Sequence, residues 1–327
     1  MAIDWDAKVL KSLTPVIENL KNIKINTEEI NKVSDWLAYE EFPSLKGHKT
    51  KKNPEEVIRT TLLINTLNFA FTDFDQSVKY EIEREGKIFS DSEAMFTQIN
   101  ETIDAGINLY EGDVLSSLDV NMLRNIFSGN IEMPMMNERV KILNEVGEKL
   151  SSNYQGDWIN FVNNGPRKLY SNGEGLIERL IEEFPRFDDK TVIDSGQEVH
   201  FYKLAQLAFW GIHGELSGAG HFVVEDMEKM SAFADYIVPV ALEVMNIISY
   251  SENLESKIMN GIVIERDSRE EVEIRAVSLY ATALLTEEIN KKRPSDKQII
   301  IPQLDYRLWK QYHATHRPHH LTITTMY

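Results

Sequence analysis

The amino-acid sequence predicts an all-α, mainly helical protein with one or two short β-hairpins. Three observations lead to this prediction. Apolar residues recur at three- and four-residue intervals along most of the chain, which is the spacing of one face of an α-helix. Only two short stretches alternate apolar and polar residues as a strand does. No linker rich in Pro, Gly or Ser interrupts the chain, so we expect a single domain over residues 1–327.

Each element follows from its own local pattern. Pro54 suits the first turn of a helix, where no backbone N–H is needed, and Ser90 with Glu93 predicts a capping box at the start of another. The two hairpins are expected over residues 78–89 and 191–201, with turns at Gly86 and Gly196. Helices are expected over residues 27–39, 54–69, 90–105, 119–127, 135–150, 174–184, 203–216, 239–249, 268–289 and 304–316.

The charge and the cysteine content exclude several classes of function. The 327 residues include 35 Lys and Arg and 52 Asp and Glu, a formal net charge of −17 with histidine neutral. Such a surface repels a phosphate backbone, so we expect no direct binding of nucleic-acid duplexes. The chain has no cysteine, which excludes disulfides and thiolate chemistry and fits a reducing, cytoplasmic compartment. No apolar run approaches the roughly 18 residues of a membrane span, so no membrane association is expected.

The last part of the chain departs from this acidic average. Residues 301–327 hold three basic residues, one acidic residue and four of the eight histidines. This local positive charge predicts a pocket for a small anion such as a phosphate, with His316 and His320 as candidate contacts. Packing and surface roles for these histidines stay open. A metal site is disfavoured because no carboxylate or cysteine is fixed beside them, and no cofactor is expected.

Four residues of the predicted helix 304–316 would share one face. At about 100° per residue, Asp305, Trp309, Tyr312 and His316 fall close together. A carboxylate, an indole, a phenol and an imidazole on one stripe resemble the wall of a ligand pocket. The alternative is a helix docked by Trp309 whose polar neighbours are hydrogen-bonded, and both interpretations remain open.

Two further segments contain charged residues at helix starts. Lys203 and Gln206 are neighbours in the first turn of the helix 203–216, where the helix dipole favours anions, although a lysine there is commonly solvated.

Gly218 and Gly220 precede Asp235, which leads into the helix near residue 239. This order resembles the helix-hairpin-helix DNA glycosylases, in which an aspartate faces the sugar. An aspartate before a helix is more often a cap.

Several dispersed segments together resemble one family more closely. They are NTLNFAF (65–71), ERVKILNE (138–145), FYKLAQ (201–206), FADY (233–236), REEVEIRA (269–276), LDYRLW (304–309) and the tail PHH at 318–320. In their order and number they are similar to the queuosine salvage family. The resemblance implies a helical, DNA-glycosylase-like fold and hydrolysis of queuosine 5′-monophosphate. The products would be queuine and ribose 5-phosphate, and the base would return to tRNA.

The resemblance also assigns roles to residues. It implies that Asp235 is the catalytic carboxylate, which stabilises an oxocarbenium-like sugar or activates water, and that Lys203 contacts the substrate. Asp305 is our own addition, as an acceptor for the guanine-like edge or the ammonium arm of the base. The remaining candidate substrate contacts are Asn68, Phe69, Phe233, Tyr236, Trp309, His316 and His320.

Two other functions remain possible from the sequence. A DNA-repair glycosylase would share the helical fold, but the acidic charge opposes it. A non-catalytic helical module that binds a nucleotide would need no catalytic carboxylate. The sequence does not identify a general acid, and a 7-deazapurine base lacks the ring nitrogen N7 that is commonly protonated in purines.

Overall fold

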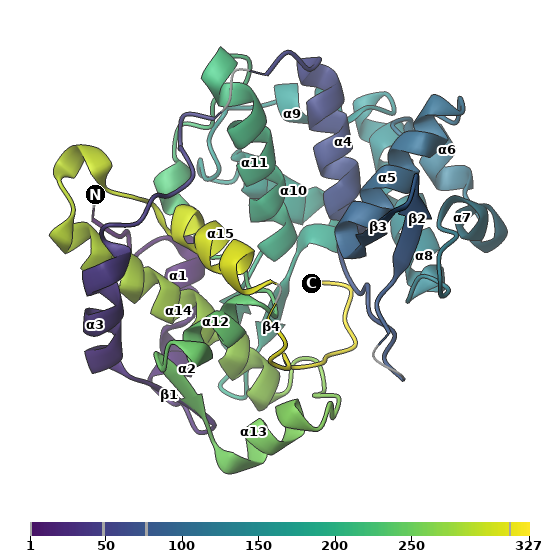
Figure 1. The fold of residues 1–327 in the computed structure, drawn as a ribbon. Coiled ribbons are helices and arrows are strands. Elements are labelled where there is room, and N and C mark those ends of the chain that lie inside the picture. Colours follow the sequence, from purple (N-terminus) through teal and green to yellow (C-terminus); the bar gives the residue numbers. More distant parts are fainter. Residues whose placement is uncertain (1, 48–49, 76–77, 314) are drawn as a thin grey trace. The chain divides into compact units, whose positions relative to one another are not determined.

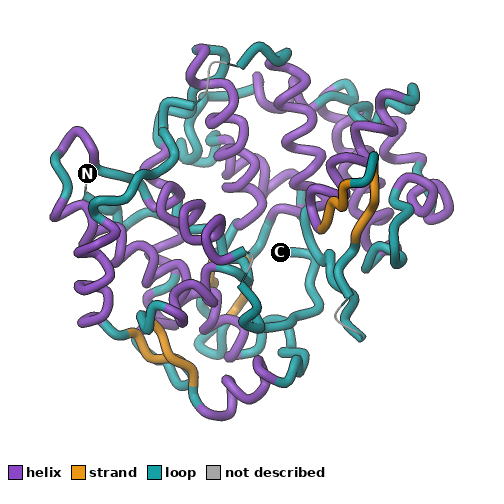
Figure 2. Tube along the Cα trace, in the orientation of Figure 1, coloured by secondary structure: helices purple, strands orange, loops and turns teal. Residues whose placement is uncertain are grey.

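The computed structural model describes residues 2–47, 50–75, 78–313 and 315–327 (Figure 1). It confirms a mainly helical fold, and its strands form only short antiparallel pairs (Figure 2). The chain divides into two compact units, each assembled from separate segments. The first unit comprises Met1–Gly47, Asp189–Trp210 and Val224–Ile323; the second comprises His48–Asp188, Gly211–Val223 and Thr324–Tyr327. The single domain expected over residues 1–327 stays a prediction.

The first unit is built around the long helix α14 (Arg269–Lys292). Ser268 caps this helix by accepting a hydrogen bond from the Glu271 N–H, and α3 (Thr27–Leu37) packs along it. Its apolar core joins α14 to α12 (Val238–Val244) and α15 (Ile301–Tyr312). The other elements of this unit are α1 (Lys8–Ser12), α2 (Thr14–Ile17), β1 (Ile23–Ile25), β4 (Lys190–Val192), β5 (Glu198–His200), η3 (Met227–Lys229), β6 (Ile248–Tyr250), α13 (Glu252–Met259) and η4 (Ser295–Lys297).

The second unit has an aromatic core. Trp158 of α9 (Trp158–Asn163) lies with its ring centroid 4.7 Å from that of Phe184 and 5.7 Å from that of Phe161. The helix α8 (Met136–Tyr154) packs tightly against α6 (Gly112–Ser117). The remaining elements are α4 (Pro54–Leu67), β2 (Glu81–Arg84), β3 (Lys87–Ser90), α5 (Asp91–Asp104), α7 (Val120–Ile126), α10 (Leu176–Glu183), η1 (Pro185–Phe187) and η2 (Ser217–Ala219). Helix α11 (Lys203–Leu216) contributes residues to both units.

Both predicted hairpins are confirmed, as the pairs β2–β3 and β4–β5.

The predicted start of one helix and the predicted end of another are wrong. Ser90 lies at the start of α5 but makes no side-chain cap, because Asp91 takes a φ of 55° and the helix does not begin with a regular turn. The helix expected over 304–316 ends at Tyr312, with His313 as its C-cap residue. His316 therefore does not share a helical face with Asp305.

The contact between α6 and α8 depends on a glycine. A Cβ added to Gly147 would lie 2.4 Å from the Ser116 backbone nitrogen and 2.5 Å from the Gly112 carbonyl oxygen. Both obstacles are backbone atoms, so neither can turn aside as a side chain could. Gly147 is therefore required for the two helices to approach this closely.

We expect Gly147→Ala to lower the free energy of unfolding by about 3 kcal/mol, because the two helices must separate to admit the methyl group. Gly214→Ala is the matched control, since this glycine also lies in a helix and a Cβ there would meet nothing within 4 Å. The control should be neutral or stabilising by up to about 1 kcal/mol. Urea titrations of the two variants measure the difference, and equal midpoints would contradict the prediction.

Within the described residues, no helix is long and apolar enough to cross a membrane.

Candidate active site

The first unit brings together three charged side chains from distant parts of the sequence. Lys203 is the first residue of α11, Asp235 lies in the loop between η3 and α12, and Asp305 lies in α15. All three are buried, with exposed fractions of 7%, 7% and 2%. Buried charges are costly unless they are paired or serve a function, so this cluster is the leading candidate for an active site.

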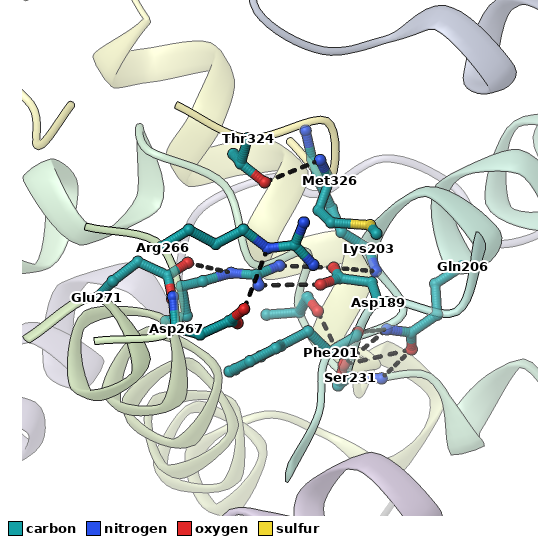
Figure 3. A network of polar contacts seen from close by, with 12 residues as sticks. Asp189, Phe201, Lys203, Gln206, Ser231, Arg266, Asp267, Glu271, Thr324 and Met326 are labelled. Carbon is teal, nitrogen blue, oxygen red and sulfur yellow. Dashed lines mark hydrogen bonds and ion pairs between the residues drawn. The ribbon is translucent and has the colours of Figure 1, made fainter. Parts of the chain in front are cut away.

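The loop that carries Asp235 is fixed at two points. Gln206, which is fully buried in α11, accepts a hydrogen bond from the Ser231 N–H at 2.9 Å and donates to the Phe201 carbonyl at 3.0 Å (Figure 3). Further along the loop, the Phe233 N–H donates to Oδ2 of Asp305 at 2.9 Å. Gln206 and Asp305 thus tie the loop to α11 and α15, and they define the position of Asp235.

Asp235 also binds the backbone at the start of the helix that follows it. Its Oδ1 accepts hydrogen bonds from the N–H groups of Ile237 and Val238, each at 2.9 Å. The N-cap residue of α12 is Ile237, so Asp235 holds the helix start from two residues before the N-cap. Among the described residues, none donates a hydrogen bond to the second oxygen, Oδ2. Two backbone N–H groups therefore orient the carboxylate through Oδ1 alone.

Burial and their mutual charges shift the pKa values of Lys203, Asp235 and Asp305. Burial raises the pKa of Asp235, while the nearby Lys203 ammonium and the two backbone N–H groups oppose that rise. Burial also raises the pKa of Asp305 well above its ordinary value, and the negative charge of Asp235 adds to the effect. Burial lowers the pKa of Lys203, against the attraction of Asp235. Two carboxyl groups whose environments differ in this way suit one ionised and one protonated role.

Lys203 is positioned by a further ion pair that the sequence did not reveal. The Arg275 guanidinium of α14 donates to both carboxylate oxygens of Asp189, at 2.9 and 2.5 Å. The backbone N–H of Lys203 lies 3.4 Å from Oδ2 of Asp189 (Figure 3). Within the described residues, the Lys203 ammonium donates no hydrogen bond. Its charge is therefore available to a bound anion as well as to Asp235.

Helix α15 carries the aromatic candidates. Trp309 is half-buried, with its ring centroid 6.2 Å from that of Tyr306 and 4.6 Å from that of His313. Within the described residues, Nδ1 of His313 is buried and has no hydrogen-bond partner. A positive charge on His313 would lower the pKa of Asp235, so this histidine lies within electrostatic range of that carboxylate. From the sequence, His313 is one of the four tail histidines considered as phosphate or substrate contacts, although His316 and His320 were the two selected.

The tail histidines lie in different environments. His316 is exposed and lies beyond the end of α15. His320 is buried, and this burial, with help from His319 and Arg275, lowers its pKa to about 3. His320 is therefore neutral at physiological pH and can offer a hydrogen bond but not a positive charge. Arg317 is already paired with Glu243, which leaves less positive charge in the tail than the sequence suggested.

Two aromatic candidates lie close to this cluster of charges along the chain. Phe233 is buried two residues before Asp235, and its ring centroid is 6.5 Å from that of Trp210. Tyr236 follows Asp235, and its ring centroid is 4.4 Å from that of His319.

Asn68 and Phe69 belong to the second unit. Asn68 directly follows α4, and Phe69 is 1% exposed. The guanidinium carbons of Arg139 and Arg186 lie 4.2 and 4.8 Å from the centre of the Phe69 ring. In this unit, Phe69 therefore packs between positively charged side chains.

Among the described residues, no group of three or more His, Asp or Glu side chains is arranged to hold a metal ion.

Comparison with known proteins gives consistent similarities. Residues 48–327 match the family model described as queuosine salvage protein. The chain is 29% identical over 318 residues to the queuosine 5′-phosphate N-glycosylase/hydrolase of Bos taurus, and the match covers 92% of each chain. It is 27% identical over 315 residues to the protein of that name from Mus musculus, covering 92% of this chain and 91% of the relative. The protein of the same name from Sphaerobacter thermophilus is 24% identical over 326 residues, or 98% and 97% of the two chains.

Proposed function

Because the chain belongs to the queuosine salvage protein family, we propose that it hydrolyses the N-glycosidic bond of queuosine 5′-monophosphate. The reaction would release queuine and ribose 5-phosphate, and the base would be salvaged for insertion into tRNA. Relatives that match along most of their length carry this activity in their names. The observation that carries the proposal is the buried cluster of Lys203, Asp235 and Asp305.

Asp235 would act on the sugar. Cleavage of an N-glycosidic bond leaves positive charge on C1′ and the ring oxygen, and an ionised carboxylate beneath C1′ makes that charge less costly. Oδ1 is held by two N–H groups, so the carboxylate needs little reorganisation when the charge develops. Oδ2 could accept a proton from the attacking water, whose oxygen then bonds to C1′.

Asp305 and Lys203 would act on the leaving base and on the phosphate. The departing base must gain a proton as the water loses one. The raised pKa of Asp305 favours its protonated form while Asp235 is ionised, so Asp305 would donate a hydrogen bond to the base rather than only accept one. The Lys203 ammonium would attract the 5′-phosphate and keep Asp235 ionised.

The other contacts remain predictions. Phe233 and Trp309 would stack on the flat deazapurine. Tyr236 would contact the nucleotide, and the tail residues His316 and His320 would contact the phosphate. We propose a small-molecule substrate, no direct binding of nucleic-acid duplexes and no membrane partner. A cytoplasmic location fits the cysteine-free composition.

Release of free base tests the function directly. The purified protein is incubated with queuosine 5′-monophosphate, and queuine is separated by chromatography and identified by its mass. We expect stoichiometric release of queuine and ribose 5-phosphate. Tight nucleotide binding without release would indicate a binding module instead. Base release from damaged duplex DNA, with a steep dependence on salt, would indicate a DNA-repair glycosylase.

The pH dependence of kcat should reflect the charge of Lys203. Activity requires ionised Asp235, so it is lost as the pH falls through the pKa of Asp235, which burial raises above its ordinary value. Because Lys203 opposes that rise, Lys203→Met should move the acid limb of the profile to higher pH. The matched control is Lys257→Met, which removes a lysine paired with Glu270 in the first unit and should leave the acid limb in place. An unchanged limb in Lys203→Met would contradict the proposed pairing.

A further inference from the structure

The backbone that leads into Lys203 is hydrogen-bonded to a single acidic residue, Asp189. The N–H groups of Phe201 and Tyr202 both donate to the Asp189 carbonyl oxygen, at 2.9 and 3.1 Å. The N–H of Lys203 follows at 3.4 Å from the Asp189 carboxylate (Figure 3). Tyr202 has a φ of 48°, a left-handed conformation that is unfavourable for an aromatic residue. Such strain persists only where the surroundings determine it, and here they consist of three successive N–H groups that face Asp189.

Asp189 would also be an electrostatic competitor of Asp235. Its carboxylate is 2% exposed and lies beside the first residue of α11, so an unpaired charge there would attract the Lys203 ammonium. Arg275 prevents this. Its guanidinium forms two hydrogen bonds with Asp189 and lies 3.9 Å above the ring of Phe201, which fixes its plane.

The charges around Lys203 agree with this geometry. The charged groups that act on Lys203 are Asp235, Arg275, Asp189 and Asp305. Asp235 raises the pKa of Lys203 more than any other charge, and the lowering by Arg275 outweighs the rise caused by Asp189. Asp189 and Arg275 thus shift the pKa of Lys203 in opposite directions, and Asp235 remains the strongest charged partner of Lys203.

We propose that Asp189 and Arg275 are a positioning pair, in which the carboxylate accepts the backbone N–H of Lys203 and the guanidinium keeps that carboxylate from capturing the Lys203 ammonium. The proposal rests on the proposed function, because it assumes that Lys203 acts on the nucleotide. Neither residue needs to contact the substrate. Their effect on catalysis would pass through the place and charge of Lys203.

Opposite shifts in the pH profile test the pair. The alkaline limb of the profile is expected where Lys203 loses its proton. In Arg275→Met, the uncompensated Asp189 should draw Lys203 away, lowering kcat about 100-fold, and should raise the pKa of Lys203 and so move this limb to higher pH. In Asp189→Asn, Arg275 keeps its pairing with Glu271 but is no longer opposed by the Asp189 charge, so it should move that limb to lower pH. The double variant, Arg275→Met with Asp189→Asn, has neither charge. Its alkaline limb should lie close to that of the wild type, and its kcat should be within about tenfold of the wild-type value. If the pair served only the stability of the fold, Arg275→Met and Asp189→Asn would lower the free energy of unfolding but would not shift the alkaline limb in opposite directions.

The controls separate the possible failures. Arg59→Met breaks a comparable Arg–Asp pair with Asp157 in the second unit, and it should leave kcat per folded molecule unchanged. If Arg275→Met does not fold, Arg275→Lys keeps the charge and should keep the alkaline limb within about half a pH unit of the wild type. Unshifted limbs in both Arg275→Met and Asp189→Asn would overturn the proposal. If the wild type releases no base, the proposed function fails, and crystals of the unliganded variants still test whether the ammonium moves toward Asp189 in Arg275→Met.

Discussion

Replacing Asp235 by asparagine should lower kcat for release of queuine by about 10³-fold while the protein stays folded. The substitution removes the negative charge that we propose stabilises the oxocarbenium-like sugar. It keeps the Oδ1 atom that accepts hydrogen bonds from Ile237 and Val238, so the backbone at the start of α12 stays held. Single-turnover release of queuine, measured beside circular dichroism of the same preparation, separates loss of chemistry from loss of structure.

An aspartate that caps another helix provides the control for this experiment. Asp119 caps α7 in the second unit by accepting a hydrogen bond from the Met122 N–H at 2.8 Å. Asp119→Asn makes the same chemical change at a helix start outside the proposed site, and its kcat should equal that of the wild type. Activity of Asp235→Asn within tenfold of the wild type would remove this carboxylate from the mechanism.

The largest effect on stability is expected at Arg139. This side chain is fully buried in α8 and donates to the carbonyl oxygens of Leu67 at 2.7 Å, Ala70 at 2.8 Å and Pro134 at 2.9 Å, and to that of Phe69. Burial lowers the pKa of Arg139 to about 9, so the guanidinium is still charged at neutral pH. One side chain therefore satisfies the carbonyl groups where α4 ends.

We expect Arg139→Met to lower the free energy of unfolding by about 4 kcal/mol, because methionine fills much of the volume but leaves those carbonyls without a donor. Total stabilities of domains are about 5–15 kcal/mol, so the variant should unfold at markedly lower urea concentration. Arg124→Met is the control, since that arginine is half exposed and only pairs with Glu132. A loss below about 1 kcal/mol in Arg139→Met would show that water replaces the guanidinium.

The sequence predicts individual helices and hairpins well, because the interval at which apolar residues recur indicates which face of an element is buried. The long helices and both hairpins are confirmed on that basis. The pairing of β1 with β6 was missed, since Ile23–Ile25 and Ile248–Tyr250 are three-residue strands joined only by the folded chain. The short helices α6, α9 and α13 were also missed, because six to eight residues contain too little of a helical period to stand out.

For the candidate site as well, the sequence identifies residues within recognisable segments but not the contacts between distant segments. Lys203 and Asp235 could be selected because they lie in segments that resemble a family. Arg275 pairs at 3.6 Å with Glu271, four residues before it in α14, which is the ordinary spacing of a helical ion pair. Its second partner, Asp189, lies in an irregular stretch before β4, and no local pattern connects it to α14. Contacts between distant segments of this kind can be found only once the chain is folded.

The segment order of the first unit has a consequence for how the protein matures on the ribosome. The stretch His48–Asp188 of the second unit is continuous and is synthesised early, whereas the first unit needs Met1–Gly47, a middle piece and residues up to Ile323. Asp305 and the pairing partner of β1 emerge only late in translation. A nascent chain therefore cannot bring Lys203, Asp235 and Asp305 together until Asp305 has been synthesised, and the proposed hydrolysis of the nucleotide requires almost all segments of the first unit.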